Sequence, residues 1–146
     1  MAYKFRLQSI LNLKVYKETQ CKEELGRCMI NLSKAEQLRD QIIMIIDNST
    51  IELQEISVSG KDLYLVEFYN NYIKYQNMLL ARQLQVVADC RKALAYARLQ
   101  LIEAMKERKI LNKLDDKLRE RYIFEMDKKE QAQLDELATT RYIALT

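Results

Sequence analysis

Hydrophobic residues recur every seven positions through the second part of the chain, with Lys, Arg, Glu and Gln between them. The series consists of Ile73, Leu80, Val87, Leu94 and Leu101. A repeat of seven is typical of a long helix that packs against a partner helix along one face. Residues 62–145 also contain neither proline nor glycine. The pattern therefore predicts one helix over about residues 62–144, with a length of about 125 Å at about 1.5 Å per residue.

A second series of the same spacing predicts a partner helix over about residues 4–57. Its hydrophobic positions follow steps of four and three, and they are Leu7, Leu11, Cys21, Leu25, Cys28, Leu32, Ala35, Ile42, Ile46, Leu53 and Ile56. Polar residues occupy the remaining positions of the series, namely Lys4, Lys14, Glu18, Arg39 and Ser49. This composition is sufficient for a coiled coil but less hydrophobic than a highly stable zipper.

One short break separates the two patterns. Gly60 can take the left-handed conformation that ends a helix, and the Asp62 carboxylate can cap the next one. We expect a turn at residues 58–61, and so short a connection makes neighbouring helices antiparallel. The predicted fold is all-α: two long helices in an antiparallel coiled-coil hairpin with the C-terminal helix longer, forming one domain over residues 1–146.

The hairpin predicts which residues face each other. With the turn centred near residue 60, residue i lies beside about residue 120 − i, which places Phe5 opposite the region of Asp115. Nothing in the first helix then covers residues beyond about 116. The last residues would extend past the first helix by about 45 Å. Their hydrophobic side chains form a stripe that would need another protein to cover it: Leu118, Tyr122, Met126, Leu134 and Leu137.

Composition excludes several classes of function. The chain of 146 residues has no histidine, no proline and no tryptophan, and it lacks a Gly-rich phosphate loop. With neither a histidine base nor such a loop, we expect no enzymatic activity, no cofactor and no metal site. Its three cysteines make neither a disulfide framework nor a CxxC motif, and no signal-peptide or membrane-spanning pattern is present. We expect a cytoplasmic protein.

Charge is unevenly distributed, although the net charge is only +3. Residues 1–22 have a net charge of +4, residues 91–121 of +5, and residues 47–90 of −3. A charge gradient of this kind can orient a molecule in the field of its partner. The basic residues are interleaved with acidic ones, which disfavours a nucleic-acid role. They either solvate the helices or meet acidic loops of a protein partner.

Two further groups of residues have alternative interpretations. Cys21, Cys28 and Cys90 are expected to be small hydrophobic fillers between the helices, with a redox role as the alternative. Cys21 and Cys28 are too far apart for a disulfide, at about 10 Å along one helix. An aromatic cluster follows the turn and includes Tyr64, Phe68, Tyr69, Tyr72, Ile73 and Tyr75. These residues either pack over the turn or form a docking patch.

Three segments of the chain resemble the flagellar export protein family FliJ. They are residues 5–14 (FRLQSILNLK) followed by Glu18, residues 68–73 (FYNNYI), and residues 108–114 (RKILNKL) continuing through 128–130 (KKE) and 134–138 (LDELA) to Arg141. Their order and spacing around one glycine-containing turn extend the resemblance over most of the chain. Members of this family are antiparallel coiled coils similar to the central stalk of rotary ATPases.

The resemblance implies partners and sites. Family members bind within the hexameric ring of the export ATPase FliI, contact the export gate protein FlhA and handle export chaperones. It implies ring-binding residues Lys4, Arg6, Lys14, Lys113, Lys117, Arg119 and Arg121. It implies gate-binding residues Phe68, Tyr69, Tyr72 and Ile73. It also implies a cytoplasmic location peripheral to the inner-membrane export gate, with ATP hydrolysed by the partner.

Two other functions remain open. One is the equivalent stalk of a virulence-type III secretion system, which would have the same shape. The other is a generic coiled-coil adaptor or chaperone that binds no ring. Two hairpins could also pair through their uncovered C-terminal segments.

Overall fold

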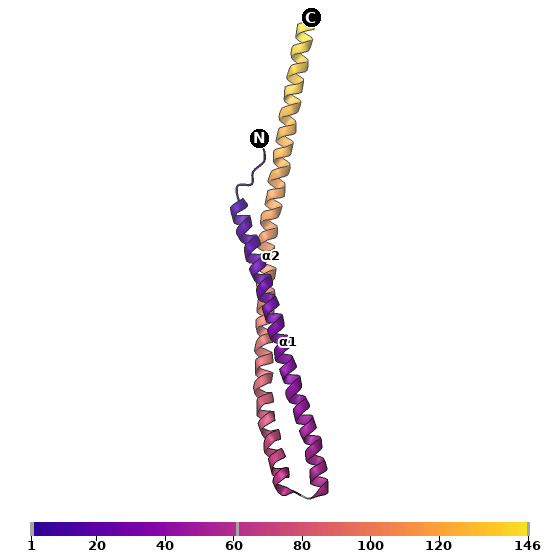
Figure 1. Ribbon diagram of the computed structural model, residues 1–146. Helices are drawn as coiled ribbons and strands as arrows, with labels where there is room; N and C mark the ends of the chain where they lie inside the picture. Colours follow the sequence, from indigo (N-terminus) through magenta and orange to yellow (C-terminus); the bar gives the residue numbers. More distant parts are fainter. Residues whose placement is uncertain (1, 61, 146) are drawn as a thin grey trace. The chain divides into compact units, whose positions relative to one another are not determined.

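A computed structural model describes residues 2–60 and 62–145, and in these ranges the chain contains two helices and no strand. Helix α1 spans Gln8–Ser59 and helix α2 spans Leu63–Leu145, with 52 and 83 residues. Figure 1 shows that α1 and α2 run in opposite directions on either side of one tight connection. The predicted all-α antiparallel hairpin with a longer second helix is confirmed.

The connection between the helices is built as its residue types predict. Gly60 has a φ of 65°, and its amide donates to the Ile56 carbonyl at 3.1 Å. A side chain at this φ would be strained, so glycine ends α1 here. The Asp62 carboxylate accepts bonds from the amides of Tyr64 and Leu65 at 3.0 and 3.2 Å. α1 extends two residues further than expected, and Lys61 of the expected turn lies outside the described residues.

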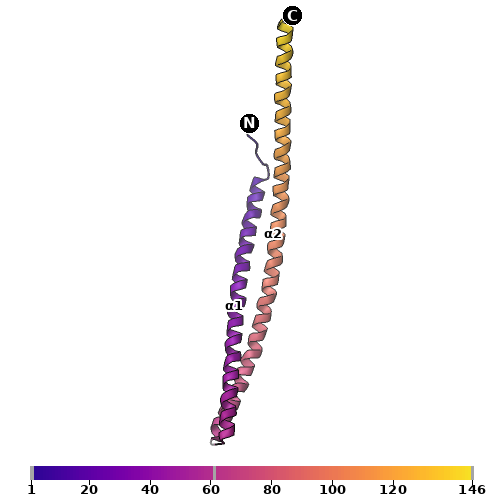
Figure 2. The same ribbon diagram turned by 90° about the vertical axis from the view of Figure 1, so that its right-hand side faces the viewer.

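The first helix begins four residues later than expected. Residues 2–7, which we call the strap, are not helical, and α1 starts only at Gln8. Tyr3 is half-buried and Phe5 is 9% exposed. In an extended chain, residues two apart point to the same side, whereas in a helix they diverge by about 200°. The extended course therefore lets both rings face α2, and Figure 2 shows the strap beside the orange part of that helix.

The described residues group into two units. The first (unit 1) comprises residues 1–19 with 102–146, and the second (unit 2) comprises residues 20–101. The expected single domain over residues 1–146 stays a prediction.

Unit 2 is packed along a hydrophobic seam. Its core consists of Cys28, Leu94 and Ala97, and Leu25 and Leu32 pack against them. The helix-1 positions of the heptad series that fall in this unit are all buried or half-buried: Cys21, Leu25, Cys28, Leu32, Ala35, Arg39, Ile42, Ile46, Ser49, Leu53 and Ile56. The repeat therefore identified the contact face correctly, including its polar interruptions.

Unit 1 buries fewer hydrophobic side chains, among them Phe5, Leu11 and Ala104. Glu18 is also buried, at 5% exposure, where it meets Arg108. Beyond Met126, every described residue of α2 is exposed. We call residues 127–145 the tail. The structure thus places the start of the fully exposed segment after Met126, about ten residues later than residue 116, because the strap lies along α2 as far as the level of Glu125.

Neither helix, within the described ranges, has a stretch long and hydrophobic enough to cross a membrane.

Candidate functional site

The strap is attached to α2 by Tyr3. Its hydroxyl donates to Asp115 Oδ1 at 2.7 Å and to the Asp115 carbonyl at 3.2 Å. The ring lies 5.7 Å from that of Tyr122 and beneath the Arg119 guanidinium, whose Cζ is 5.4 Å from the ring centroid. Burial and the bond to Asp115 together raise the pKa of the Tyr3 hydroxyl, so it remains a donor at neutral pH. One aromatic side chain therefore fixes both the strap and an arginine.

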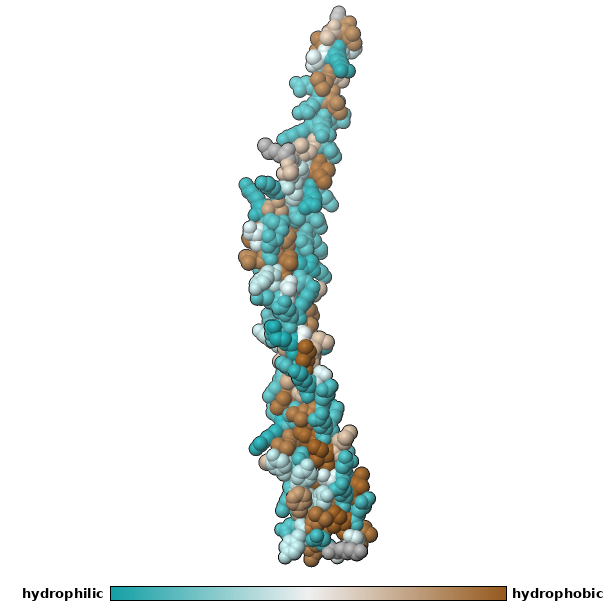
Figure 3. Space-filling view, viewed as in Figure 1, coloured by the Kyte–Doolittle hydropathy of each residue, from teal (hydrophilic) through white to brown (hydrophobic). Residues whose placement is uncertain are grey.

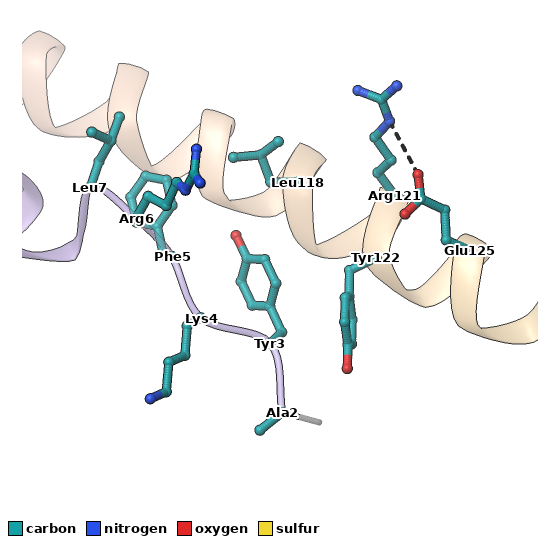
Figure 4. A pocket seen from close by; sticks show the side chains of 10 residues that line it. All are labelled: Ala2, Tyr3, Lys4, Phe5, Arg6, Leu7, Leu118, Arg121, Tyr122 and Glu125. Atoms are coloured by element: carbon teal, nitrogen blue, oxygen red, sulfur yellow. Dashed lines mark ion pairs between the residues drawn. The ribbon is translucent and has the colours of Figure 1, made fainter.

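An open groove forms where the strap crosses α2 (Figure 4). Residues 2–7 line one side, and the other is lined by Leu118, Arg121, Tyr122 and Glu125. Arg121 pairs with Glu125 at 3.7 Å, along one face of α2. Lys4 points away from α2 in Figure 4. The groove thus combines a hydrophobic floor with a charged rim, which is the usual composition of a protein-binding surface.

The seven basic residues expected to bind a ring all belong to unit 1. Lys4, Arg6, Lys113, Lys117, Arg119 and Arg121 are exposed, and Lys14 is half-buried. The structure brings Lys4 and Arg6 of the strap to the groove that Arg121 also lines. Arg119 lies 3.6 Å from Asp115 as well as over the Tyr3 ring. Strap and helix therefore both contribute basic residues to the groove at this level of α2, with Lys4 pointing away from the helix (Figure 4).

Lys14 has a different environment from the other six. Its Nζ donates to Glu107 Oε2 at 3.0 Å, and Lys17 approaches the same oxygen at 3.6 Å. The hydrogen bond and the two positive charges hold the pKa of the Glu107 carboxyl below its usual value. Lys14 therefore contributes to the contact between the helices, and its charge is largely compensated there.

The aromatic residues expected to bind a gate belong to unit 2. The Phe68 ring stacks on Tyr72, with centroids 6.1 Å apart and planes 5° apart, and it meets Tyr69 edge to face at 5.7 Å. Phe68 is 60% exposed, whereas Tyr69, Tyr72 and Ile73 are half-buried. The Tyr69 hydroxyl donates to Glu52 of α1, and this bond raises the pKa of Tyr69. The cluster therefore both packs against α1 and presents one ring face to solvent.

Other expectations about the side chains are met in part. Cys28 lies in the hydrophobic core, and burial raises the pKa of its thiol, as expected of a packing residue. Cys21 and Cys90 are half-buried, and all three cysteines are free thiols. Within residues 2–60 and 62–145, no group of three or more carboxylate or cysteine side chains could hold a metal ion.

Sequence reasoning missed the strap. The expected site residues do not include Tyr3 and Asp115, because the heptad pattern predicts a helix from about residue 4. The available signal was the spacing of Tyr3 and Phe5, two aromatics two residues apart, which suits an extended segment.

The predicted pairing of the helices is close to the observed one. Glu52 meets Tyr69, Lys14 meets Glu107 and Tyr3 meets Asp115. Each partner lies within two residues of the position given by counting from the turn.

Comparison with known proteins adds two findings. The family model described as "Flagellar FliJ protein" matches residues 3–144. A solved structure described as that of a YscO homolog from Chlamydia trachomatis is similar, with a TM-score of 0.59 and 17% sequence identity. The match covers 97% of this chain and 96% of the other. No curated protein matches the sequence.

Proposed function

The chain belongs to the flagellar FliJ protein family, and from this premise we propose that it is a non-enzymatic central-stalk component of the flagellar type III export apparatus. In this role it binds the hexameric, FliI-like export ATPase and links it to the FlhA-like export gate. It thereby promotes assembly of the ATPase and protein export, and it also handles export chaperones. ATP is hydrolysed by the partner, and the complex lies on the cytoplasmic side of the gate.

The observation that carries the proposal is the uncovered end of α2. In unit 1 the strap and the basic residues surround α2 between Lys113 and Tyr122, and the exposed tail follows at once. A single helix without a partner, bordered by positive charge, is a suitable shape and charge for entering a pore lined by acidic loops. The similarity of fold to a YscO homolog suits a flagellar or a virulence-type system equally, and the FliJ family match favours the flagellar one.

A stalk of this kind can act through its asymmetry. Two helices have no six-fold symmetry, so at any moment they contact the six subunits of a ring differently. Subunits that contact Arg119 and Arg121 would have one nucleotide state stabilised over another, because a ligand shifts an equilibrium by its differential affinity for the two states. Ring assembly and hydrolysis would in this way respond to the position of the stalk.

The proposed gate contact consists of Phe68, Tyr69, Tyr72 and Ile73. Exposed aromatic side chains are frequent among residues that dominate binding energy. Phe68 is exposed and held by contacts with both tyrosines, so little conformational entropy would be lost on binding.

Ring binding is tested by reversing charge at the groove. Arg121→Glu is the preferred variant, because Arg121 is 77% exposed and pairs only weakly along its own helix with Glu125. Arg119→Glu would also disturb Tyr3 and is harder to interpret. Co-sedimentation with the ATPase of the same organism should show binding weakened by roughly tenfold for Arg121→Glu, together with less stimulation of ATP turnover.

The matched control is Lys92→Glu, an equal charge change at an exposed position of unit 2. The stalk function is rejected if the wild-type chain leaves assembly and turnover of the ATPase unchanged. An adaptor acting through Tyr72 would be indifferent to Arg121→Glu.

Gate binding is tested separately with Phe68→Ala. We expect loss of binding to the cytoplasmic domain of the gate protein, with ATPase stimulation retained. Tyr96→Ala removes an aromatic ring of similar exposure outside the cluster and serves as the control. Equal losses in the two variants would contradict the assignment.

A further inference from the structure

The tail carries a hydrophobic stripe that does not continue the seam between the helices. A helix turns by about 100° per residue. From Tyr122 and Met126, the seam side of the helix continues through Lys129, Gln133 and Glu136, all polar. Leu134 and Leu145 lie about 100° and 120° from the middle of that side, and Leu137 lies about 40° from it, so the stripe is centred to one side of the seam. A helix that extended the line of α1 would therefore meet mainly polar side chains, with Leu137 at its edge, and a partner that covers both Leu134 and Leu137 approaches from another direction.

The stripe is exposed and lies along a shallow hollow. Leu134 and Leu137 are each 61% exposed and Leu145 is 89% exposed. A shallow hollow is lined by Leu134, Leu137, Ala138, Arg141, Tyr142 and Leu145. Figure 3 shows hydrophobic patches among hydrophilic ones along this C-terminal part of α2.

The spacing along this stripe is that of a coiled-coil core. Glu130, Leu134, Leu137 and Arg141 follow steps of four, three and four. Two leucines stand in the middle, with an acidic residue before them and a basic residue after them, all exposed.

This order of charges favours a second copy of the chain, in the antiparallel direction, as the partner of the stripe. If a second copy lies antiparallel, with Leu134 beside Leu137 of that copy, Glu130 of each chain faces Arg141 of the other. This register buries Leu134 and Leu137 of both chains and forms two ion pairs. In a parallel arrangement, Glu130 would face Glu130 and Arg141 would face Arg141, which is repulsive. The stripe is thus complementary to itself only when the second chain runs in the opposite direction.

We propose that the tail is a self-association surface, on which a second copy of this chain docks antiparallel through Leu134 and Leu137, with Glu130 and Arg141 selecting the direction. The interface has two hydrophobic layers and is short, so the association is weak and depends on concentration. A paired tail is unavailable to any other partner that needs residues 127–145. This inference goes beyond the proposed export role and does not depend on it.

The test uses the full chain and charge-swapped variants. Sedimentation equilibrium over a wide range of protein concentration should show a monomer–dimer equilibrium for the wild type. Glu130→Arg alone and Arg141→Glu alone should each weaken dimerisation by roughly tenfold, since two exposed pairs turn from attractive to repulsive. An equimolar mixture of the two variants should recover the wild-type affinity, and so should the double variant.

The single variants separate the two directions, because the mixture would associate in either one. In a parallel dimer each position faces itself, so neither single variant would change the number of repulsive pairs. Lys129→Glu, on the seam side of the tail, is the matched control and should leave dimerisation unchanged. A wild type that stays monomeric at every concentration overturns the proposal, as do single variants with unchanged affinity or a mixture that recovers nothing. Circular dichroism of each variant checks that the helix is intact.

Discussion

The contact between α1 and α2 differs between the two units in how many hydrophobic side chains it buries. In unit 2 the contact is mainly hydrophobic, with Cys28, Leu94 and Ala97 at its core. In unit 1 fewer hydrophobic side chains are buried, and the contact also includes polar pairs, namely Glu18 with Arg108, Lys14 with Glu107, and Tyr3 with Asp115. Hydrophobic packing is not directional, whereas ion pairs and hydrogen bonds require particular partners.

The difference suggests a division of tasks. Packing in unit 2 supplies stability that salt and moderate pH leave unchanged. Polar pairs in unit 1 add less stability, but they fix which residue of α1 lies beside which residue of α2. Register matters most in unit 1, because there it sets how far α2 extends beyond its partner. Four changes test this contrast.

The largest effect is expected in the hydrophobic core of unit 2. Leu94→Ala removes a buried side chain against Cys28 and Ala97, and should lower the free energy of unfolding by about 2–3 kcal/mol. Urea titration followed by circular dichroism measures the change. Leu99→Ala, at a position 62% exposed, is the control and should cost under about 0.5 kcal/mol. Similar losses of unfolding free energy in both variants would contradict a localised core.

A smaller effect is expected at the buried ion pair of unit 1. Arg108→Leu removes the guanidinium that meets the buried Glu18 carboxylate and should cost about 1–3 kcal/mol. The double variant Glu18→Leu with Arg108→Leu should recover most of that loss, because a hydrophobic pair suits the same site. If the double variant is as unstable as the single one, the ion pair contributes to the free energy of unfolding as well as to the register of the helices. Urea titration is again the measurement.

A local effect is expected at the strap. Tyr3→Phe keeps the ring against Tyr122 and Arg119 but removes both bonds to Asp115. Amide hydrogen exchange in residues 4–7 should accelerate by roughly fivefold, while the global unfolding transition stays unchanged. Tyr142→Phe, in the exposed tail, should alter neither. Unchanged exchange in the strap would mean that Phe5 alone holds it.

The smallest effect concerns pH. The pKa of Glu107 is below its usual value, chiefly because Lys14 hydrogen-bonds the ionised carboxylate. A lowered pKa means that the folded state favours the charged form, so the stabilisation is complete above the unfolded value of about 4.3. It is lost as the pH falls through the lower, folded value.

Glu107→Gln should therefore reduce the loss of stability between neutral and acidic pH, measured by thermal unfolding at a series of pH values. Glu103→Gln is the control, because Glu103 is exposed and pairs with Lys106 of its own helix at 3.8 Å. An unchanged acid transition in Glu107→Gln would show that the contact with Lys14 contributes nothing to stability.

Much of this architecture followed from local patterns. The heptad series identified the contact faces, and Gly60 and Asp62 identified the turn, because each of these signals acts over a few residues. The strap did not follow from them, because Tyr3 and Phe5 adopt an extended course only when the surface of α2 is there to receive both rings. The candidate basic residues were found individually, but nothing local indicated that Lys4 and Arg6 would lie beside Arg121.

By itself, the sequence determined that this protein has two antiparallel helices of unequal length, since helix periodicity, a glycine end and a carboxylate cap are properties of short segments. Only the tertiary structure decided where coverage of α2 stops and which arginine lies over the Tyr3 ring. Those features depend on side chains about a hundred residues apart in the chain, and their meeting is fixed by the register of the whole hairpin and not by any local pattern.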